Sequence, residues 1–324
     1  MDMHEEIRNG YTVTAQMKRV WAIQMDMAKK LIEVCDRNGL KVWAASGTLL
    51  GCVRDRGFIP WDDDIDMVML RDDYDKLVSI AEKEFTHPYF FQTAYSEKAP
   101  YPREHAQMRY ANTAAILPYD IFADFDQSIF IDIFVMDGVP ESDVELSHLL
   151  NRINKIKFYL QKKTFGYRAR IGAPSTWIKW AKLKLHFLFH SFLATYRSLE
   201  NELRKQPVEK SRFVTKIGFF SNMQYVTTRK LDREWYKETI YMPFEDMQMP
   251  VPVGYDKVLT TLYGDYMKPA KAPAVHGGFA VLDTEHSYRD YLETCRKKAY
   301  RRKLSASWPG PESRRSSARR STSS

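Results

Sequence analysis

Apolar and polar residues follow two different periodicities along this chain, and the alternation between them predicts a mixed α/β fold. Over residues 13–38 apolar positions recur every three to four residues, which predicts a helix that ends at Asn38-Gly39. Short apolar runs after this helix predict buried strands instead. The elements expected next are a strand at 40–46, a brief helix at 49–54, a turn at 56–60, a strand at 62–70 and a helix at 72–85.

The rest of the chain moves from strands to helices. We expect strands at 89–93, 107–110, 114–117 and 128–136, helices at 141–165 and 175–205, a mixed stretch at 225–275, and a last helix at 283–298. This order predicts an α/β (α+β) protein, with a mixed-sheet core and helical additions. The predicted division is a catalytic core over 13–140, a helical and mixed part over 141–295, and a tail over 296–324.

Composition excludes several protein classes. The 324 residues are 44% hydrophobic and 28% charged, with 14 Gly, 15 Pro and 3 Cys, so collagen-like, low-complexity and disulfide-scaffold proteins are ruled out. The net charge of +8 is confined to one end: segment 296–324 carries +9, which leaves −1 on the other 295 residues. Such a basic, Ser-rich tail is either a solvated extension or a tether to an anionic surface. The near-neutral body gives no reason to expect a nucleic-acid partner.

The cysteines and the apolar runs bear on location. Cys35, Cys52 and Cys295 are widely spaced, which favours free thiols in a reducing compartment over bridges or a zinc site. The first ten residues are acidic and polar, unlike a signal peptide, and no run of 18 apolar residues occurs. We therefore expect a cytoplasmic protein without a transmembrane helix.

The most informative segment is the acidic run Asp62-Asp63-Asp64-Ile65-Asp66. On a strand, alternate residues share a face, so Asp62, Asp64 and Asp66 would point the same way with Cα atoms about 6.6 Å apart. Two charges at that distance repel by about 2.5 kcal/mol at an effective dielectric constant near 20. A chain tolerates this repulsion where water or cations offset it. The segment is therefore either a solvated acidic turn or a site for Mg²⁺ or Mn²⁺, which prefer carboxylate oxygens.

The neighbouring residues favour the metal site. Ser46-Gly47-Thr48 lies between an apolar strand and a helix start, where backbone N–H groups and a hydroxyl can bind phosphate. Such a turn followed by Asp-x-Asp on the next strand is the layout of nucleotidyltransferase folds, in which a later strand brings a third carboxylate. Asp132, within the apolar run 129–135, is the candidate; its alternative is a salt bridge to an arginine.

These blocks together resemble the LicD family, which includes bacterial phosphocholine transferases and the fukutin and fukutin-related proteins. The resemblance rests on 46–54 followed by 57–66, on 132–140, and on 251–256 with 262–269, and it covers roughly residues 15–280. It implies a nucleotidyltransferase-like fold with a divalent metal. It also implies transfer of a phospho-alcohol, with phosphocholine from CDP-choline favoured over ribitol or glycerol phosphate, to a hydroxyl of a surface glycan, with release of CMP.

The resemblance also assigns roles to residues. It implies that Asp64 and Asp66 bind metal with the help of Asp62, whereas the third place of Asp132 follows from the strand argument above. Arg54 and Arg56 are expected either to bind the donor diphosphate or to form salt bridges with the acidic run. The remaining candidates are Arg109 for the nucleotide, with a surface hairpin as the alternative, and Trp61, Tyr263 and His276 for substrate.

Residues 177–196 combine Trp, Leu and Phe with one polar face that contains Lys179, Lys182, His186 and His190. Such a helix either lies on a membrane surface or packs in a core with a thin exposed stripe. With the basic tail, the first alternative predicts peripheral contact with the inner face of the cytoplasmic membrane.

Three functions follow as hypotheses. The first is a metal-dependent CDP-alcohol phosphotransferase. The second is a polynucleotide-type nucleotidyltransferase, which the net charge of −1 on the body argues against. The third is a non-catalytic glycan- or nucleotide-binding protein that kept the fold, which the presence of Asp62, Asp64 and Asp66 argues against.

Overall fold

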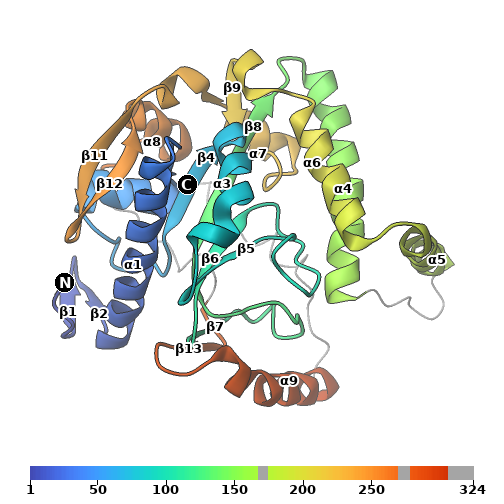
Figure 1. Cartoon of the computed structure of the whole chain (residues 1–324), viewed down its shortest axis with the longest axis horizontal. Coiled ribbons are helices and arrows are strands. Elements are labelled where there is room, and N and C mark those ends of the chain that lie inside the picture. Colours follow the sequence, from blue (N-terminus) through green and yellow to red (C-terminus); the bar gives the residue numbers. More distant parts are fainter. Residues whose placement is uncertain (167–173, 269–277, 306–324) are drawn as a thin grey trace, which may run out of the picture.

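A mixed sheet of seven strands forms the centre of the protein (Figure 1). The computed structural model describes residues 1–166, 174–268 and 278–305. The sheet runs in the order β10-β9-β8-β4-β3, and β6 joins β5 to another part of β8. Its strands are β3 (Trp43–Ala44), β4 (Asp66–Leu70), β5 (Tyr89–Gln92), β6 (Ala106–Tyr110), β8 (Ile129–Val139), β9 (Phe213–Thr215) and β10 (Leu231–Asp232).

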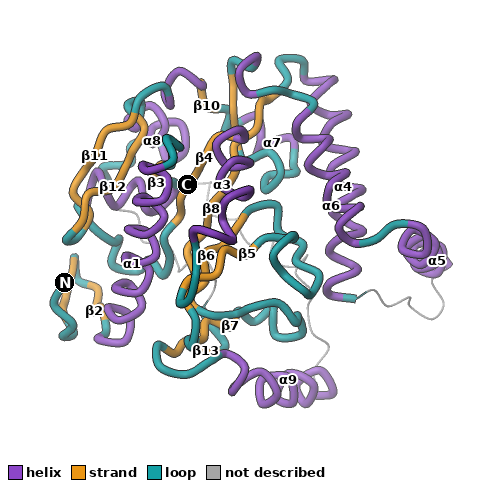
Figure 2. The backbone as a smooth tube through the Cα atoms, in the orientation of Figure 1, coloured by secondary structure: helices purple, strands orange, loops and turns teal. Residues whose placement is uncertain are grey.

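Helices and small hairpins surround this sheet, as the tube in Figure 2 shows. In Figure 1, α1 and the β11–β12 hairpin lie on one side of it, α4 and α6 lie on the other, and α9 lies below. These and the remaining elements are β1 (Glu6–Arg8), β2 (Tyr11–Val13), α1 (Ala15–Arg37), α2 (Ser46–Leu50), a π-helical turn (Gly51–Asp55), α3 (Arg71–Glu84), β7 (Ala114–Ile116), α4 (Asp143–Phe165), α5 (Pro174–Phe189), α6 (Phe192–Arg204), a 3₁₀ turn (Val208–Lys210), α7 (Met223–Thr227), a 3₁₀ turn (Arg233–Tyr236), β11 (Thr239–Phe244), β12 (Met247–Pro252), α8 (Tyr255–Tyr263), β13 (Val281–Asp283) and α9 (Tyr288–Ser305).

The predicted α+β class is confirmed, and local sequence signals explain several elements. Helix α1 begins at Thr14, whose hydroxyl accepts a hydrogen bond from the Met17 N–H, and it ends before Gly39, which has a positive φ of 64°. Strand β8 is buried along its whole length, as its largely apolar sequence predicts for a central strand. The division into regions at residues 140 and 296 stays a prediction.

The core places α1 against the turn that leads into the acidic run. Phe58 stacks on Trp21 of α1 with ring centroids 4.4 Å apart, and its other neighbour is Phe244 of β11, at 4.8 Å. These rings belong to one large apolar cluster that also includes residues of β4, β8 and α8. Burial of aromatic rings on both sides of Phe58 stabilises this turn and thereby positions the residues that follow it.

The predicted strand at 62–70 is wrong in its first half, because β4 begins only at Asp66. The carbonyl groups just before it are used by α1 instead of a neighbouring strand. Trp21 Nε1 donates to the Asp62 carbonyl at 3.1 Å, and Gln24 Nε2 donates to the Asp63 carbonyl at 3.0 Å. With these acceptors taken by helix side chains, Asp62, Asp63 and Asp64 form no strand, and the Ile65 carbonyl that follows accepts from the Asp132 N–H of β8 at 2.9 Å.

Two predicted helices also differ from the structure. The predicted helix at 175–205 divides into α5 and α6 around His190, because the Ser191 hydroxyl accepts from the Ala194 N–H and starts a new helix. The last helix begins at Tyr288, and Val281–Asp283 instead forms strand β13 against β7. Of the helices that the structure describes, none has the length and apolar content that crossing a lipid bilayer requires.

Candidate functional site

Three carboxylates meet where β4 and β8 run side by side. The two strands are parallel, and their register sets Asp66 directly beside Asp132. Asp64 joins them from the extended segment before β4, and one carboxylate oxygen from each residue lies within 4.8 Å of the other two. We call Asp64, Asp66 and Asp132 the carboxylate triad. A second group of three, formed by Asp62, Asp63 and Asp64, meets the same distance limit and shares Asp64 with the triad.

The electrostatic state of these groups is unusual for aspartates. Burial, together with the charges of Asp66 and Asp63, raises the pKa of Asp62 to about 7. Burial and then the neighbouring carboxylates, led by Asp66, raise the pKa of Asp64 well above its ordinary value. Like charges held this close inside a protein disfavour ionisation. A hard divalent cation offsets that repulsion, and buried, convergent carboxylate oxygens are the ligands that Mg²⁺ and Mn²⁺ prefer.

Lys216 brings a positive charge to the triad. It follows β9, its Nζ donates to the Ser46 hydroxyl at 3.0 Å, and it lies 4.0 Å from the centroid of the Phe134 ring. Burial lowers the pKa of Lys216, whereas the charges of Asp66, Asp132 and Asp64 act in the opposite direction. No sequence motif marked this lysine, since it reaches the site from a segment about 150 residues after the acidic run.

These groups line a cavity of about 1190 Å³. The cavity is acidic at the triad and basic elsewhere, which suits a ligand that carries both phosphate and a neutral or cationic end. Aromatic rings complete its wall. The acidic residues of the lining are Asp62, Asp64, Asp66, Asp132 and Asp265, and its basic residues are Arg54, Arg103, Lys216, Arg229 and Lys268.

Comparison with known proteins identifies the family. A family model described as "LicD/FKTN/FKRP, nucleotidyltransferase domain" matches residues 39–179. The lipopolysaccharide cholinephosphotransferase LicD of Haemophilus influenzae is 31% identical over 236 residues, which cover 72% of this chain and 85% of that protein. This chain belongs to the LicD family. An uncharacterized protein of Rickettsia prowazekii is 32% identical over 135 residues, which cover 41% of this chain and 45% of that protein.

In this LicD-family chain, Ser46, Gly47 and Thr48 begin helix α2 and lie against the acidic residues of the site. Ser46 and Gly47 line the cavity, and Gly47 has no room for a larger side chain, because a Cβ there would collide with the Asp62 carboxylate. Thr48 does not line the cavity. Its hydroxyl accepts a hydrogen bond from the Asp66 N–H at 2.9 Å and so fixes the start of β4.

The predicted arginines fall into different places. Arg54 lines the cavity, and its Nε donates to Asp55 at 2.9 Å. Arg56 is exposed, has a positive φ of 55°, and is absent from the cavity wall, because it ends the π-helical turn that follows α2. Of the two, Arg54 lies at the cavity wall and forms an ion pair with Asp55, which precedes the acidic run. Binding of the donor diphosphate by either arginine stays a prediction.

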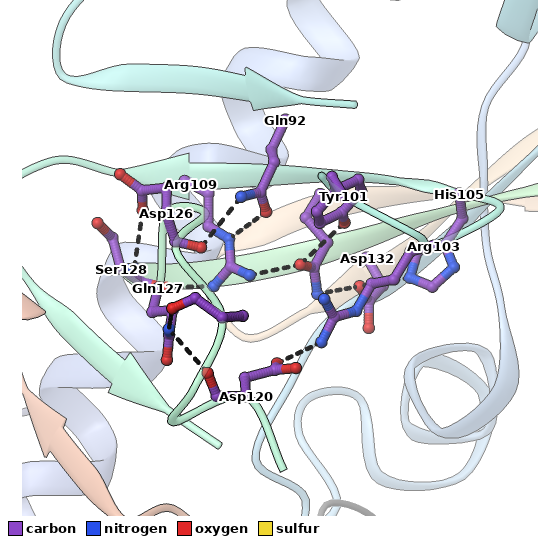
Figure 3. Close-up of polar contacts among 12 residues, drawn as sticks. Gln92, Tyr101, Arg103, His105, Arg109, Asp120, Asp126, Gln127, Ser128 and Asp132 are labelled. Atoms are coloured by element: carbon purple, nitrogen blue, oxygen red, sulfur yellow. Dashed lines mark hydrogen bonds and ion pairs between the residues drawn. The ribbon is translucent and has the colours of Figure 1, made fainter. Parts of the chain in front are cut away.

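Both alternatives predicted for Arg109 are wrong, since this residue lies neither in the cavity wall nor on a surface hairpin. It is buried in β6 and stacks on Phe130, with its guanidinium carbon 4.6 Å from the ring centroid. Figure 3 shows its guanidinium between Gln92 and Ser128. It donates to Gln92 Oε1 at 2.7 Å, to the Ser128 carbonyl at 2.6 Å and to Gln107 Oε1.

This network holds Asp132 in place. Gln107 Oε1 accepts from Arg109 and, at 3.1 Å, from the Tyr101 hydroxyl, so the amide is turned with its nitrogen toward Asp132. Gln107 Nε2 then donates to Asp132 Oδ1 at 2.7 Å. His105 Nε2 lies 3.2 Å from the same oxygen. Asp132 thus accepts from an amide, and Arg109 acts on it from one residue further away.

Removal of the Gln107 amide should weaken metal use without unfolding the protein. We expect Gln107→Met to raise the Mg²⁺ or Mn²⁺ concentration for half-maximal activity by about 10–100-fold, the usual cost of losing a group that orients a metal ligand. The matched control is Tyr101→Phe, which removes one donor to Gln107 and leaves the Arg109 contact in place. A metal titration of both variants tests this. An unchanged half-saturating concentration in Gln107→Met would contradict the assigned role.

Two of the three residues predicted to bind substrate lie at the cavity. Trp61 and Tyr263 line the cavity, and Tyr119 adds a third aromatic ring to its wall. His276 lies outside the described residues. Arg103, which sequence reasoning missed, lines the cavity and pairs with Asp120 beside the triad (Figure 3).

Proposed function

We propose that this LicD-family protein transfers phosphocholine from CDP-choline to a hydroxyl group of a cell-surface glycan such as lipopolysaccharide or teichoic acid, and releases CMP. The observation that carries the proposal is the carboxylate triad facing Lys216 in one large cavity. The Haemophilus influenzae relative, which is a lipopolysaccharide cholinephosphotransferase by name, supports the choice of choline and of the acceptor. The description of the matching family supports a relationship to nucleotidyltransferases.

The proposed reaction is an in-line displacement at phosphorus. The acceptor hydroxyl oxygen forms a bond to the phosphorus that bears choline, and the bond from that phosphorus to the bridging oxygen of the diphosphate breaks. The electron pair of that bond leaves with CMP. The proton of the hydroxyl goes to a carboxylate, either Asp62 or Asp132. Asp62 is a candidate because it lies beside the carboxylate triad, and burial raises its pKa to about 7 in the absence of metal, within the range of a general base.

The other residues of the cavity bind and orient. Asp64, Asp66 and Asp132, with Asp62 beside them, are the groups that would hold Mg²⁺ or Mn²⁺, and the bound metal would stabilise negative charge on the transferred phosphoryl group. Lys216 offers a positive charge for the diphosphate, and Arg54 and Arg103 lie in the same wall to add donors. Ser46 and Gly47 bring the turn close to the donor, while Trp61 and Tyr263 supply aromatic faces that a quaternary ammonium group prefers.

We further propose a cytoplasmic location. The support is chemical: Cys35, Cys52 and Cys295 are all free thiols in the structure, as a reducing compartment maintains them.

A donor panel tests the reaction and the metal together. The protein is incubated with an acceptor glycan and, in separate samples, CDP-choline, CDP-ribitol or CDP-glycerol, and CMP is measured with Mg²⁺ and after chelation with EDTA. We expect CMP from CDP-choline alone, lost with EDTA and restored by added Mg²⁺ or Mn²⁺. CMP from the ribitol or glycerol donor would reassign the alcohol, and no CMP from any of the three would support a binding protein.

A further inference from the structure

Helix α5 contacts the rest of the protein along one side. Leu183 is buried there, and the His186 ring stacks on Tyr159 of α4 with centroids 4.3 Å apart. His186 Nε2 also lies 2.8 Å from the Thr195 hydroxyl of α6, and Lys163 of α4 lies 5.1 Å from the Phe187 ring centroid. These contacts fix the rotation of α5 about its own axis. The histidine side, expected from the sequence to be exposed, faces the protein.

The opposite side of α5 is apolar and exposed. Trp177, Ile178, Leu185, Leu188 and Phe189 each expose between 51% and 73% of their surface. At 3.6 residues per turn they fall within a single arc of roughly 120°. We call these five residues the outer arc. Figures 1 and 2 show α5 standing apart from the body, at the far end of α4. The alternative of a core helix with a thin exposed stripe is therefore wrong, because the exposed side is the apolar one.

Basic residues border the outer arc. On the same helical geometry Lys184 lies roughly 20° beyond one edge of the arc and Lys182 roughly 20° beyond the other. Lys179 and Lys182 also line a hollow with Lys155 of α4. Helix α5 contains no Asp or Glu. Apolar and aromatic side chains flanked by lysines are suited to an anionic lipid surface, where the rings enter the acyl boundary and the ammonium groups reach phosphates.

We propose that α5 lies flat in the interface of a membrane containing anionic phospholipid, with the outer arc buried among the acyl chains. The charge pattern favours this occupant over a protein partner, because lysines border the outer arc on both edges and the helix contains no acid, which complements a layer of anionic headgroups. The proposal goes beyond the transfer reaction and holds whichever alcohol is transferred. Its consequence for function is local concentration, since a protein held at the membrane meets lipid-linked acceptors there.

Vesicle flotation of the full-length protein tests the proposal. The vesicles are phosphatidylcholine with or without phosphatidylglycerol, and the variant Leu185→Glu/Leu188→Glu places two acids in the outer arc. The matched control, Ile7→Glu/Val144→Glu, adds the same charges at two other exposed apolar residues. We expect the wild type and the control to float with the anionic vesicles, and the α5 variant to partition about tenfold less.

Two further readouts separate α5 from other causes. Binding through the basic tail is electrostatic and should disappear at high salt, whereas binding through the outer arc should persist in part. Equal CMP release by the wild type and the α5 variant, with a soluble acceptor, shows that the variant is folded. Failure of the wild type to bind anionic vesicles, or equal flotation of the α5 variant, would overturn the proposal. Loss of a dimer in the α5 variant without any vesicle binding would assign the arc to a second copy of the chain.

Discussion

Replacing Asp64 or Asp66 with asparagine should abolish phosphocholine transfer while it stabilises the metal-free protein. Each substitution removes one ligand charge from the carboxylate triad, so we expect CMP release to fall by about 10³-fold or more. It also relieves repulsion between buried carboxylates less than 5 Å apart. We therefore expect the free energy of unfolding without metal to rise by about 1 kcal/mol. Activity assays and thermal unfolding of the same samples test both.

Opposite signs for activity and stability separate a lost metal ligand from a misfolded protein. The matched control is Asp63→Asn, since Asp63 is buried next to Asp64 but does not line the cavity. We expect it to retain most of the activity. If Asp63→Asn inactivated the protein and Asp66→Asn did not, the second acidic group, Asp62 to Asp64, would be the metal site.

Replacing Lys216 with methionine should have the second-largest effect on activity and the reverse effect on stability. Methionine keeps much of the apolar packing against Phe134 but removes the charge that we assign to the donor diphosphate. We expect kcat/KM for CDP-choline to fall by about 10²–10³-fold. The triad also loses its nearby positive charge, so the metal-free protein should unfold at a lower temperature.

Lys230→Met provides the control for this prediction. Lys230 lies just before β10, is largely buried, and pairs with Asp143 at 3.7 Å, away from the cavity. It should retain normal kcat/KM. An unchanged kcat/KM in Lys216→Met would mean that other cations, such as Arg54 or Arg229, hold the diphosphate.

Much of the fold was predictable from local signals. Helices α1 and α3 and strand β8 lie within a few residues of the expected bounds, because each has a strong apolar period, a capping residue or an unbroken apolar run. Strands β9 and β10 were not predicted. They have only three and two residues, which is too short for an alternation of apolar and polar residues to be recognised. The start of β4 was misplaced because Trp21 and Gln24, which bond to the carbonyl groups of Asp62 and Asp63, come from a helix about 40 residues earlier.

The candidate site was predictable only in its acidic half. Asp64 and Asp66 stand in one short motif, and placing Asp132 beside them needed only the assumption that two apolar strands pair. Lys216 and Arg103 lie in segments without regular patterns and join the cavity through tertiary packing, so no local signal marks them. Arg109 misled for a physical reason: an arginine on a short strand suggests an exposed position, but here buried acceptors surround its guanidinium.

Asp66 and Asp132 are held in place in different ways: Asp66 through its backbone, and Asp132 through its side chain. Thr48 holds the Asp66 backbone, whereas Asp132 depends on the Arg109–Gln107 network on β6. Helix α2 and strand β6 thus each position one member of the triad. Substitutions in either element should act through the metal, as the Gln107→Met titration tests.

The most direct test of the central claim is the stoichiometry of transfer. Purified protein with Mg²⁺, CDP-choline labelled in the choline group, and a lipopolysaccharide lacking choline would be sampled over time for CMP and for label on the glycan. We predict one label on the glycan for each CMP released, and neither product with the Asp64→Asn/Asp66→Asn variant. CMP release without label on the glycan, or transfer that survives in this variant, would contradict the proposed reaction and its site.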